Sequence, residues 1–148
     1  MKQPIIWMIL TVFPCLALGE TALSETGAIT QSESLNYAHV THVVATQKPN
    51  GTWCFDTTVR HNDEGWDHYA DGWEVIGQQG KTLGVRPLAH PHDNEQPFTR
   101  RLCNIEIPAN IATVTVRAKC NVHGFGGNTI TIDLNIDHGR NYSLHRPN

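Results

Sequence analysis

The residues with the clearest chemical potential lie in the segment Leu88–Arg100, which combines imidazoles with carboxylates. His90 and His92 supply the imidazoles, and Asp93 and Glu95 supply the carboxylates. Prolines in the same segment fix φ and remove backbone donors, so we expect a stiff, extended loop. Two histidines on such a loop can form half of a metal or ligand site. The other half must come from elsewhere in the fold.

The composition indicates a small β-rich domain with an unusual supply of histidine. The chain has 148 residues and nine histidines, against 11 lysines and arginines together. Twelve glycines, eight prolines and the lack of a long helical periodicity favour short strands joined by turns. The formal net charge is −3, and no basic patch occurs, so a nucleic-acid partner is not expected.

The first residues are typical of an export signal. Lys2 gives a positive start, residues 5–18 form an apolar stretch, and residues 17–19 suit cleavage before Glu20. The apolar stretch is too short to span a membrane. We therefore expect a signal peptide over 1–19 and a periplasmic or secreted protein. Cys15 raises the question of a lipid anchor, but Pro14 before it is a poor fit to that motif.

The chain after residue 19 divides into a leader, one domain and a tail. A flexible leader is predicted over 20–35, the folded domain over 36–137, and a coil tail over 138–148. Seven strands are predicted in the domain, over residues 37–45, 52–60, 73–76, 82–88, 98–107, 113–118 and 129–136. The fold class is therefore all-β, an antiparallel two-sheet sandwich of immunoglobulin or fibronectin III type. A jelly roll or a small barrel is the alternative.

Three cysteines remain after the predicted signal peptide, namely Cys54, Cys103 and Cys120. In an oxidising compartment two of them should form a disulfide. We predict the pair Cys103–Cys120, because both lie near the ends of strands that flank one connection. Cys54 is then a buried thiol that packs as a small hydrophobe. Metal ligation by cysteine has no support from a Cys-x-x-Cys spacing.

The strand count predicts that three loops meet at one pole of the sandwich. If successive strands alternate in direction, residues 65–72, 89–97 and 121–128 emerge at the same end. The predicted metal ligands that converge there are His68, His90, His92 and His123. Several neutral imidazoles suit Cu²⁺ or Zn²⁺, and an exported protein meets both ions. The alternative is that these histidines are ordinary loop residues.

A second set of residues is expected to support the histidines or to contact a ligand. Its members are Asp67, Asp71, Glu95, Trp66, Tyr69, Trp73, Arg100 and Phe125. Glu95 and Arg100 are interpreted chiefly as an ion pair that ties the loop to the following strand. The aromatic residues favour an alternative function, a non-catalytic module that binds a glycan, a peptide or a partner protein.

Catalysis is the function class that the sequence supports least. No Gly-x-Ser-x-Gly, His-Glu-x-x-His or phosphate-binding loop occurs. An enzyme that activates water with a metal would need an open coordination position beside a base such as Glu95. The expected partner is therefore a metal ion or small ligand at the loop pole.

Three motifs resemble a family of small exported bacterial proteins of unknown function. They are Gly-Trp-Asp-His-Tyr-Ala-Asp-Gly-Trp-Glu-Val over 65–75, His-Pro-His-Asp-Asn-Glu-Gln-Pro-Phe-Thr-Arg over 90–100, and Val-His-Gly-Phe-Gly-Gly over 122–127. The resemblance covers most of the chain after the leader. It implies an exported protein and brings no activity with it.

Overall fold

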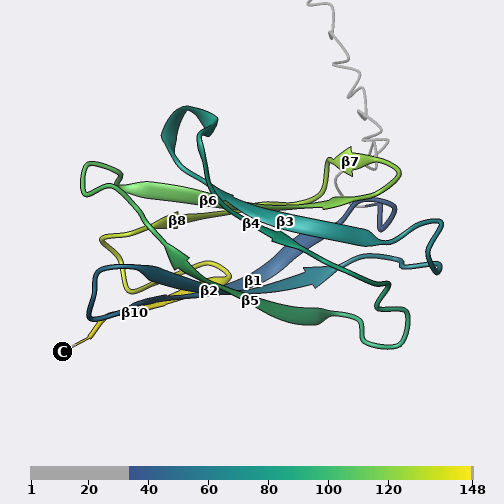
Figure 1. The fold of residues 1–148 in the computed structure, drawn as a ribbon, viewed down its shortest axis with the longest axis horizontal. Helices are drawn as coiled ribbons and strands as arrows, with labels where there is room; N and C mark the ends of the chain where they lie inside the picture. The colour runs from purple at the N-terminus through teal and green to yellow at the C-terminus, as the bar shows by residue number, and fades with distance from the viewer. Residues whose placement is uncertain (1–33, 148) are drawn as a thin grey trace, which may run out of the picture.

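The computed structural model describes residues 34–147, and the predicted signal peptide and Cys15 lie outside this range. The described chain forms two β-sheets that pack face to face (Figure 1). The predicted all-β two-sheet sandwich is therefore confirmed. Within residues 34–147 no helix has the length and apolar character needed to cross a membrane.

The first sheet has the strand order β5-β2-β1-β10-β9. β1 (His39–Gln47) and β2 (Trp53–Arg60) form the predicted antiparallel hairpin. β5 (Phe98–Ile105) pairs antiparallel with β2. β10 (Tyr142–His145) runs parallel to β1 and pairs with the short β9 (His138–Gly139). This sheet therefore joins the beginning and the end of the described chain.

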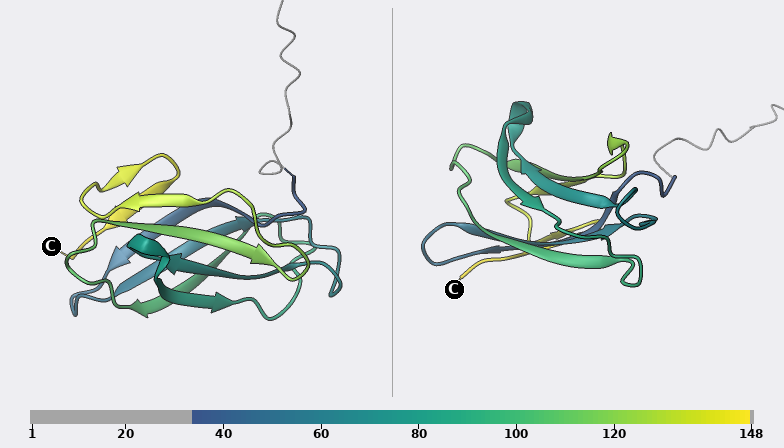
Figure 2. Two further views of the ribbon diagram at one scale, coloured as in Figure 1. Left: turned by 90° about the horizontal axis from the view of Figure 1, so that it is seen from above. Right: turned by 45° about the vertical axis from the view of Figure 1, so that its right-hand side comes forward.

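The second sheet has the order β4-β3-β6-β7, and β8 also pairs with β6. Its strands are β3 (Ala70–Ile76), β4 (Thr82–Pro87), β6 (Thr113–Cys120), β7 (Gly124–Phe125) and β8 (Ile130–Asp133). A single 3-10 turn, η2 (Gln78–Gly80), joins β3 to β4. The two layers are seen from other directions in Figure 2.

The core lies between the sheets and follows the period of two that strands impose on side chains. On β6 every second residue is buried, from Val114 through Val116 and Ala118 to Cys120. On the facing sheet Phe55 and Val59 of β2 are fully buried, as the alternation of this strand predicts. Burial of these apolar side chains supplies the main stabilisation of the sandwich.

The end of the chain departs from the prediction. All seven predicted strands are present, but β7, β9 and β10 add to them, and β10 falls in the stretch predicted as a coil tail. Tyr142 and Leu144 alternate as buried residues of β10, so the coil prediction is wrong there. The last residues of the predicted leader also contact the domain, since the Asn62 amide donates to the Leu35 carbonyl at 3.0 Å.

The disulfide joins Cys54 to Cys103, so the predicted Cys103–Cys120 pair is wrong and Cys54 is no thiol. The physical reason is the strand order. β2 and β5 are hydrogen-bonded neighbours, and the two cysteines face each other with their Cα atoms 4.0 Å apart. Cys120 lies in the other sheet, buried, and is not disulfide-bonded among the described residues.

Three loops and the segment before β1 meet at one end of the sandwich, on the right of Figure 1. The Gly65 amide donates to Asp93 at 3.1 Å, which joins the first loop to the second. The Tyr69 amide donates to the Asn121 side chain at 2.9 Å, which joins the first loop to the third. The predicted convergence of these loops is therefore confirmed. We call this end the loop pole.

Candidate metal centre

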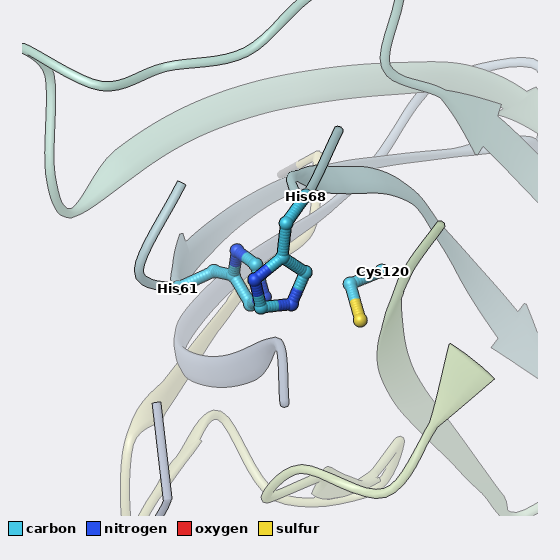
Figure 3. Close-up of side chains that lie close together, drawn as sticks. All are labelled: His61, His68 and Cys120. Carbon is cyan, nitrogen blue, oxygen red and sulfur yellow. The ribbon is translucent and has the colours of Figure 1, made fainter. Parts of the chain in front are cut away.

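Three side chains that can bind a metal, His61, His68 and Cys120, lie together at the loop pole (Figure 3). One nitrogen of each ring and the Cys120 sulfur all lie within 4.8 Å of one another. His61 directly follows β2, His68 precedes β3, and Cys120 ends β6. Strand ends from both sheets therefore fix the positions of the three groups.

The backbone carbonyl of Asn36 faces all three groups. Its oxygen lies 3.2 Å from His61 Nε2, 3.3 Å from His68 Nε2 and 3.4 Å from Cys120 Sγ. The carbonyl belongs to a turn in which the Tyr37 amide donates to the Ser34 carbonyl at 3.0 Å. A single oxygen atom thus marks the point at which the three side chains converge.

Asp63 is a buried carboxylate behind His61. Its Oδ1 accepts hydrogen bonds from His61 Nδ1 at 2.6 Å and from the Ala70 amide at 3.0 Å. Its Oδ2 accepts one from the His92 amide at 2.7 Å. Burial by itself raises the pKa of Asp63, but the hydrogen bonds from His61, His92 and Ala70 outweigh it and lower the pKa overall. An ionised Asp63 therefore holds the proton of His61 on Nδ1 and directs Nε2 toward the group.

The three groups are nearly closed to solvent. His61 and Cys120 are each 1% exposed, and the His68 side chain is 13% exposed. The exposed His123 covers the sulfur, with its Nδ1 3.6 Å and its backbone amide 3.2 Å from Cys120 Sγ. The thiolate is the form of cysteine that binds metals, and the His123 amide donates to this sulfur.

The four predicted histidine ligands lie in two pairs. The ring centroids of His68 and His123 are 5.0 Å apart, and those of His90 and His92 are 4.6 Å apart. In the described part of the chain, only His68 of these four belongs to a group whose ligand atoms are all within 4.8 Å. Metal ligation by His90, His92 and His123 stays a prediction.

The pair His90 and His92 has other contacts. The His92 ring stacks on Phe98, with centroids 3.8 Å apart. Burial lowers the pKa of His92, and the Coulombic effects of Arg100 and His90 act in the same direction, so the neutral form of its ring is favoured. His90 is exposed, and its Nδ1 lies 2.9 Å from the Pro91 carbonyl.

The predicted ion pair of Glu95 and Arg100 forms at the surface. Arg100 donates to both carboxylate oxygens of Glu95, at 2.8 and 3.2 Å. This hydrogen bonding lowers the pKa of Glu95 and raises that of Arg100. Asp71 pairs with Lys119 at 2.6 Å. The Asp67 side chain is exposed, and its backbone carbonyl accepts from Asn121 at 3.2 Å.

The predicted aromatic residues differ widely in exposure. Trp73 is 1% exposed because it occupies a core position of β3, and its contact with a ligand stays a prediction. Trp66 is 66% exposed and packs edge-on against Tyr69, with centroids 5.8 Å apart. Phe125 is 41% exposed, but the Arg117 guanidinium lies over its ring at 4.0 Å.

Sequence reasoning missed four parts of the site. His61 and Asp63 were not among the predicted site residues, although a histidine directly after a predicted strand was a usable signal. Cys120 was assigned to a disulfide, and its Cys-x-x-His spacing to His123 was overlooked. The Asn36 carbonyl had no signal at all, because a backbone oxygen leaves no trace in the sequence.

The chain is similar to a protein of Halomicrobium mukohataei named "Putative lipoprotein", with 36% identity over 115 residues. The matched stretch covers 78% of this chain and 56% of the relative. The chain thus spans about half the length of the curated relative that it matches. No family model and no solved structure matches the chain.

Proposed function

We propose that this chain is an exported protein that binds one copper or zinc ion through His61, His68 and Cys120. The observation that carries the proposal is the grouping of two imidazole nitrogens and one sulfur within 4.8 Å. Ligand atoms on one tetrahedral zinc ion, bound at about 2.1 Å for nitrogen and about 2.3 Å for sulfur, are about 3.4 to 3.6 Å apart. Shifts of about 1 Å or less would therefore bring the three atoms onto one ion.

The groups around these ligands also suit a metal. Asp63 receives the Nδ1 proton of His61, the arrangement that orients a metal-binding imidazole and raises its basicity. Cys120 supplies a sulfur ligand, and the His123 amide donates to that sulfur. Both features support binding of a borderline or soft transition metal rather than calcium or magnesium.

Three observations support the export of this chain. The N-terminal residues have the pattern of a signal peptide. The Cys54–Cys103 disulfide is typical of proteins that fold in an oxidising compartment. The name of the relative from Halomicrobium mukohataei adds to this, because lipoproteins are exported. We propose a periplasmic or secreted location on these grounds.

Calorimetric titration of tag-free protein with Zn²⁺ tests the proposal. One ion should bind per chain, and His61→Ala, His68→Ala and Cys120→Ser should each weaken binding at least about tenfold, or about 1.4 kcal/mol. His145→Ala is the matched control, because His145 is exposed on β10 beside Thr46, away from the loop pole. Equal affinity in all four variants would show that the group is not the site.

A binding module for a glycan, peptide or protein is the second candidate, and the exposed Trp66 beside Tyr69 favours it. The two functions differ in their pH dependence. Histidine ligands must be neutral, and the reference pKa of imidazole is about 6.5, so metal affinity should fall steeply from about pH 7 to 5. Aromatic stacking has no such dependence. Ligand binding that persists at pH 5 and requires Trp66 would support the second candidate.

A further inference from the structure

We infer that the ion is copper and that the His61, His68 and Cys120 site carries single electrons, with the Asn36 carbonyl as a weak axial contact. This inference rests on the proposed metal-binding function and adds the identity of the metal and its task. Sites with two histidines, one cysteine and a distant axial oxygen are characteristic of copper that transfers electrons.

The position of the Asn36 oxygen is the first argument. It lies at 3.2 and 3.3 Å from the two imidazole nitrogens and at 3.4 Å from the sulfur. Because the three distances are nearly equal, the oxygen lies over the centre of the triangle that the three ligand atoms form. An ion among the three would therefore have a backbone carbonyl as its fourth neighbour.

The hydrogen bonding of His61 is the second argument. Because its Nδ1 donates to Asp63 at 2.6 Å, a neutral His61 ring has its lone pair on Nε2. The Asn36 carbonyl oxygen lies 3.2 Å from that nitrogen. A cation bound beside both atoms would be held by the imidazole lone pair and by the carbonyl oxygen.

The ligand set and its burial favour copper over zinc. Structural zinc usually has four side-chain ligands, and catalytic zinc keeps an open position for water. Here three side chains converge, the fourth direction holds a backbone carbonyl, and two of the side chains are 1% exposed. Neither zinc pattern is met. A thiolate with two imidazoles, in contrast, suits copper in both of its common oxidation states.

The surrounding hydrogen bonds keep the site rigid, as electron transfer requires. Asp63 joins His61 to β3 through the Ala70 amide. The Asn121 side chain donates to the Trp66 and Asp67 carbonyls and so fixes the loop that carries His68. Ligands held in this way move little when the charge of the ion changes, so little energy is spent on rearrangement at each transfer.

The electron-transfer step needs no bond to a substrate. A one-electron donor reduces Cu²⁺ to Cu⁺, and the same three ligands hold both ions. A one-electron acceptor of higher potential then oxidises Cu⁺ to Cu²⁺ again. No proton or leaving group moves. His123 is exposed, and its Nδ1 lies 3.6 Å from the sulfur, so it gives the electron a short path from the surface to Cys120.

The test is the absorption and electron paramagnetic resonance spectrum of tag-free protein with one equivalent of Cu²⁺. An intense visible thiolate-to-copper charge-transfer band should appear, bleach with ascorbate and return with ferricyanide. Cys120→Ser should lose the band, whereas His145→Ala should keep it. Because Cys120→Ser could fold poorly, Co²⁺ added to the unmutated protein provides a second measurement, and it should show a thiolate-to-cobalt band.

The outcomes separate this inference from the proposed function. Binding of Zn²⁺ or Cu²⁺ that depends on His61 and His68 but gives no thiolate band would overturn the copper assignment and leave metal binding intact. Oxidation of Cys120 by Cu²⁺ with release of Cu⁺ would also overturn the copper assignment. Tight Zn²⁺ binding that requires His123 would overturn it too. Failure of every ion to bind would overturn both proposals.

Discussion

The two ends of the sandwich contain buried sulfur in different chemical states. Near the start of β2, Cys54 is bonded to Cys103 on the neighbouring strand. At the end of β6, Cys120 remains a thiol beside His61 and His68. Both Cys54 and Cys120 are 1% exposed, so burial alone does not explain the difference. What faces the sulfur decides its role.

The surroundings of the two sulfurs differ in polarity. Cys54 lies between the buried Trp53 and Phe55 in the sequence, and its disulfide joins two neighbouring strands of one sheet. The loop pole instead buries His61 and the Asp63 carboxylate, groups that lose hydration on folding. Their hydrogen bonds offset this loss but do not explain why polar groups occupy the position. Buried polarity of this kind is typical of a functional site.

The largest expected effect concerns the disulfide. Replacing both Cys54 and Cys103 by alanine should lower the free energy of unfolding by about 4 kcal/mol, the chain-entropy estimate for a bond that closes a loop of about 50 residues. Urea denaturation followed by fluorescence measures this loss. Zn²⁺ affinity should not change, because the bond lies at the other end of β2.

A double variant with the parent's urea midpoint would show that the bond does not stabilise the fold. A variant that folds but no longer binds Zn²⁺ would show that the two ends are coupled. Cys120→Ser is the matched comparison. It should alter metal binding more than stability, which is the reverse of the effect expected for the disulfide pair.

The second expected effect concerns Asp63. Asp63→Asn removes the charge that accepts the His61 Nδ1 proton and should destabilise the metal-free protein by about 2 kcal/mol at neutral pH. It should also weaken Zn²⁺ binding about tenfold, because the orientation of His61 is lost. Denaturation and calorimetry measure the two quantities. Asp67→Asn is the control, since the Asp67 side chain is exposed.

The pH dependence of this destabilisation has a definite sign. The pKa of Asp63 is lowered in the folded protein, so its ionisation stabilises the fold above the unfolded pKa of about 3.9. The contribution is lost as pH falls below this value and through the folded pKa. The stability difference between parent and Asp63→Asn should therefore shrink below about pH 4. A constant difference down to pH 2 would contradict the role assigned to the carboxylate.

The fold was predictable where alternation is local and apolar. Thr113–Cys120 alternates clearly, and so does the buried face of Trp53–Arg60. β10 was missed because its four residues offer only two apolar positions, Tyr142 and Leu144, which are too few to establish an alternation. Its parallel pairing with β1 joins segments far apart in the sequence, which no local pattern reveals.

The candidate site was only partly predictable, and one error accounts for much of the gap. The convergence of the loops followed from the strand directions, and it placed His68 correctly at the loop pole. The disulfide pairing depended on which strand lies beside β5, a fact that the sequence does not contain. Assigning Cys120 to that bond removed the sulfur from the site. The Asn36 carbonyl depends on how residues 34–37 fold back, which is a tertiary property.

The smallest expected effect concerns His90, and it separates the sequence-based ligand set from the observed group. Four histidines sharing one ion would make His90→Ala weaken Zn²⁺ binding at least about tenfold. In the structure His90 is exposed, faces the Pro91 carbonyl and pairs with His92. We therefore expect a change of less than about twofold, or about 0.4 kcal/mol, in the calorimetric titration. His68→Ala, measured in the same way, is the comparison, because both residues come from the predicted set. Because His90 is exposed, its removal should leave the fold unchanged, so an affinity loss would mean direct ligation. Equal tenfold losses in the two variants would restore the four-histidine site and require the loops to rearrange on metal binding.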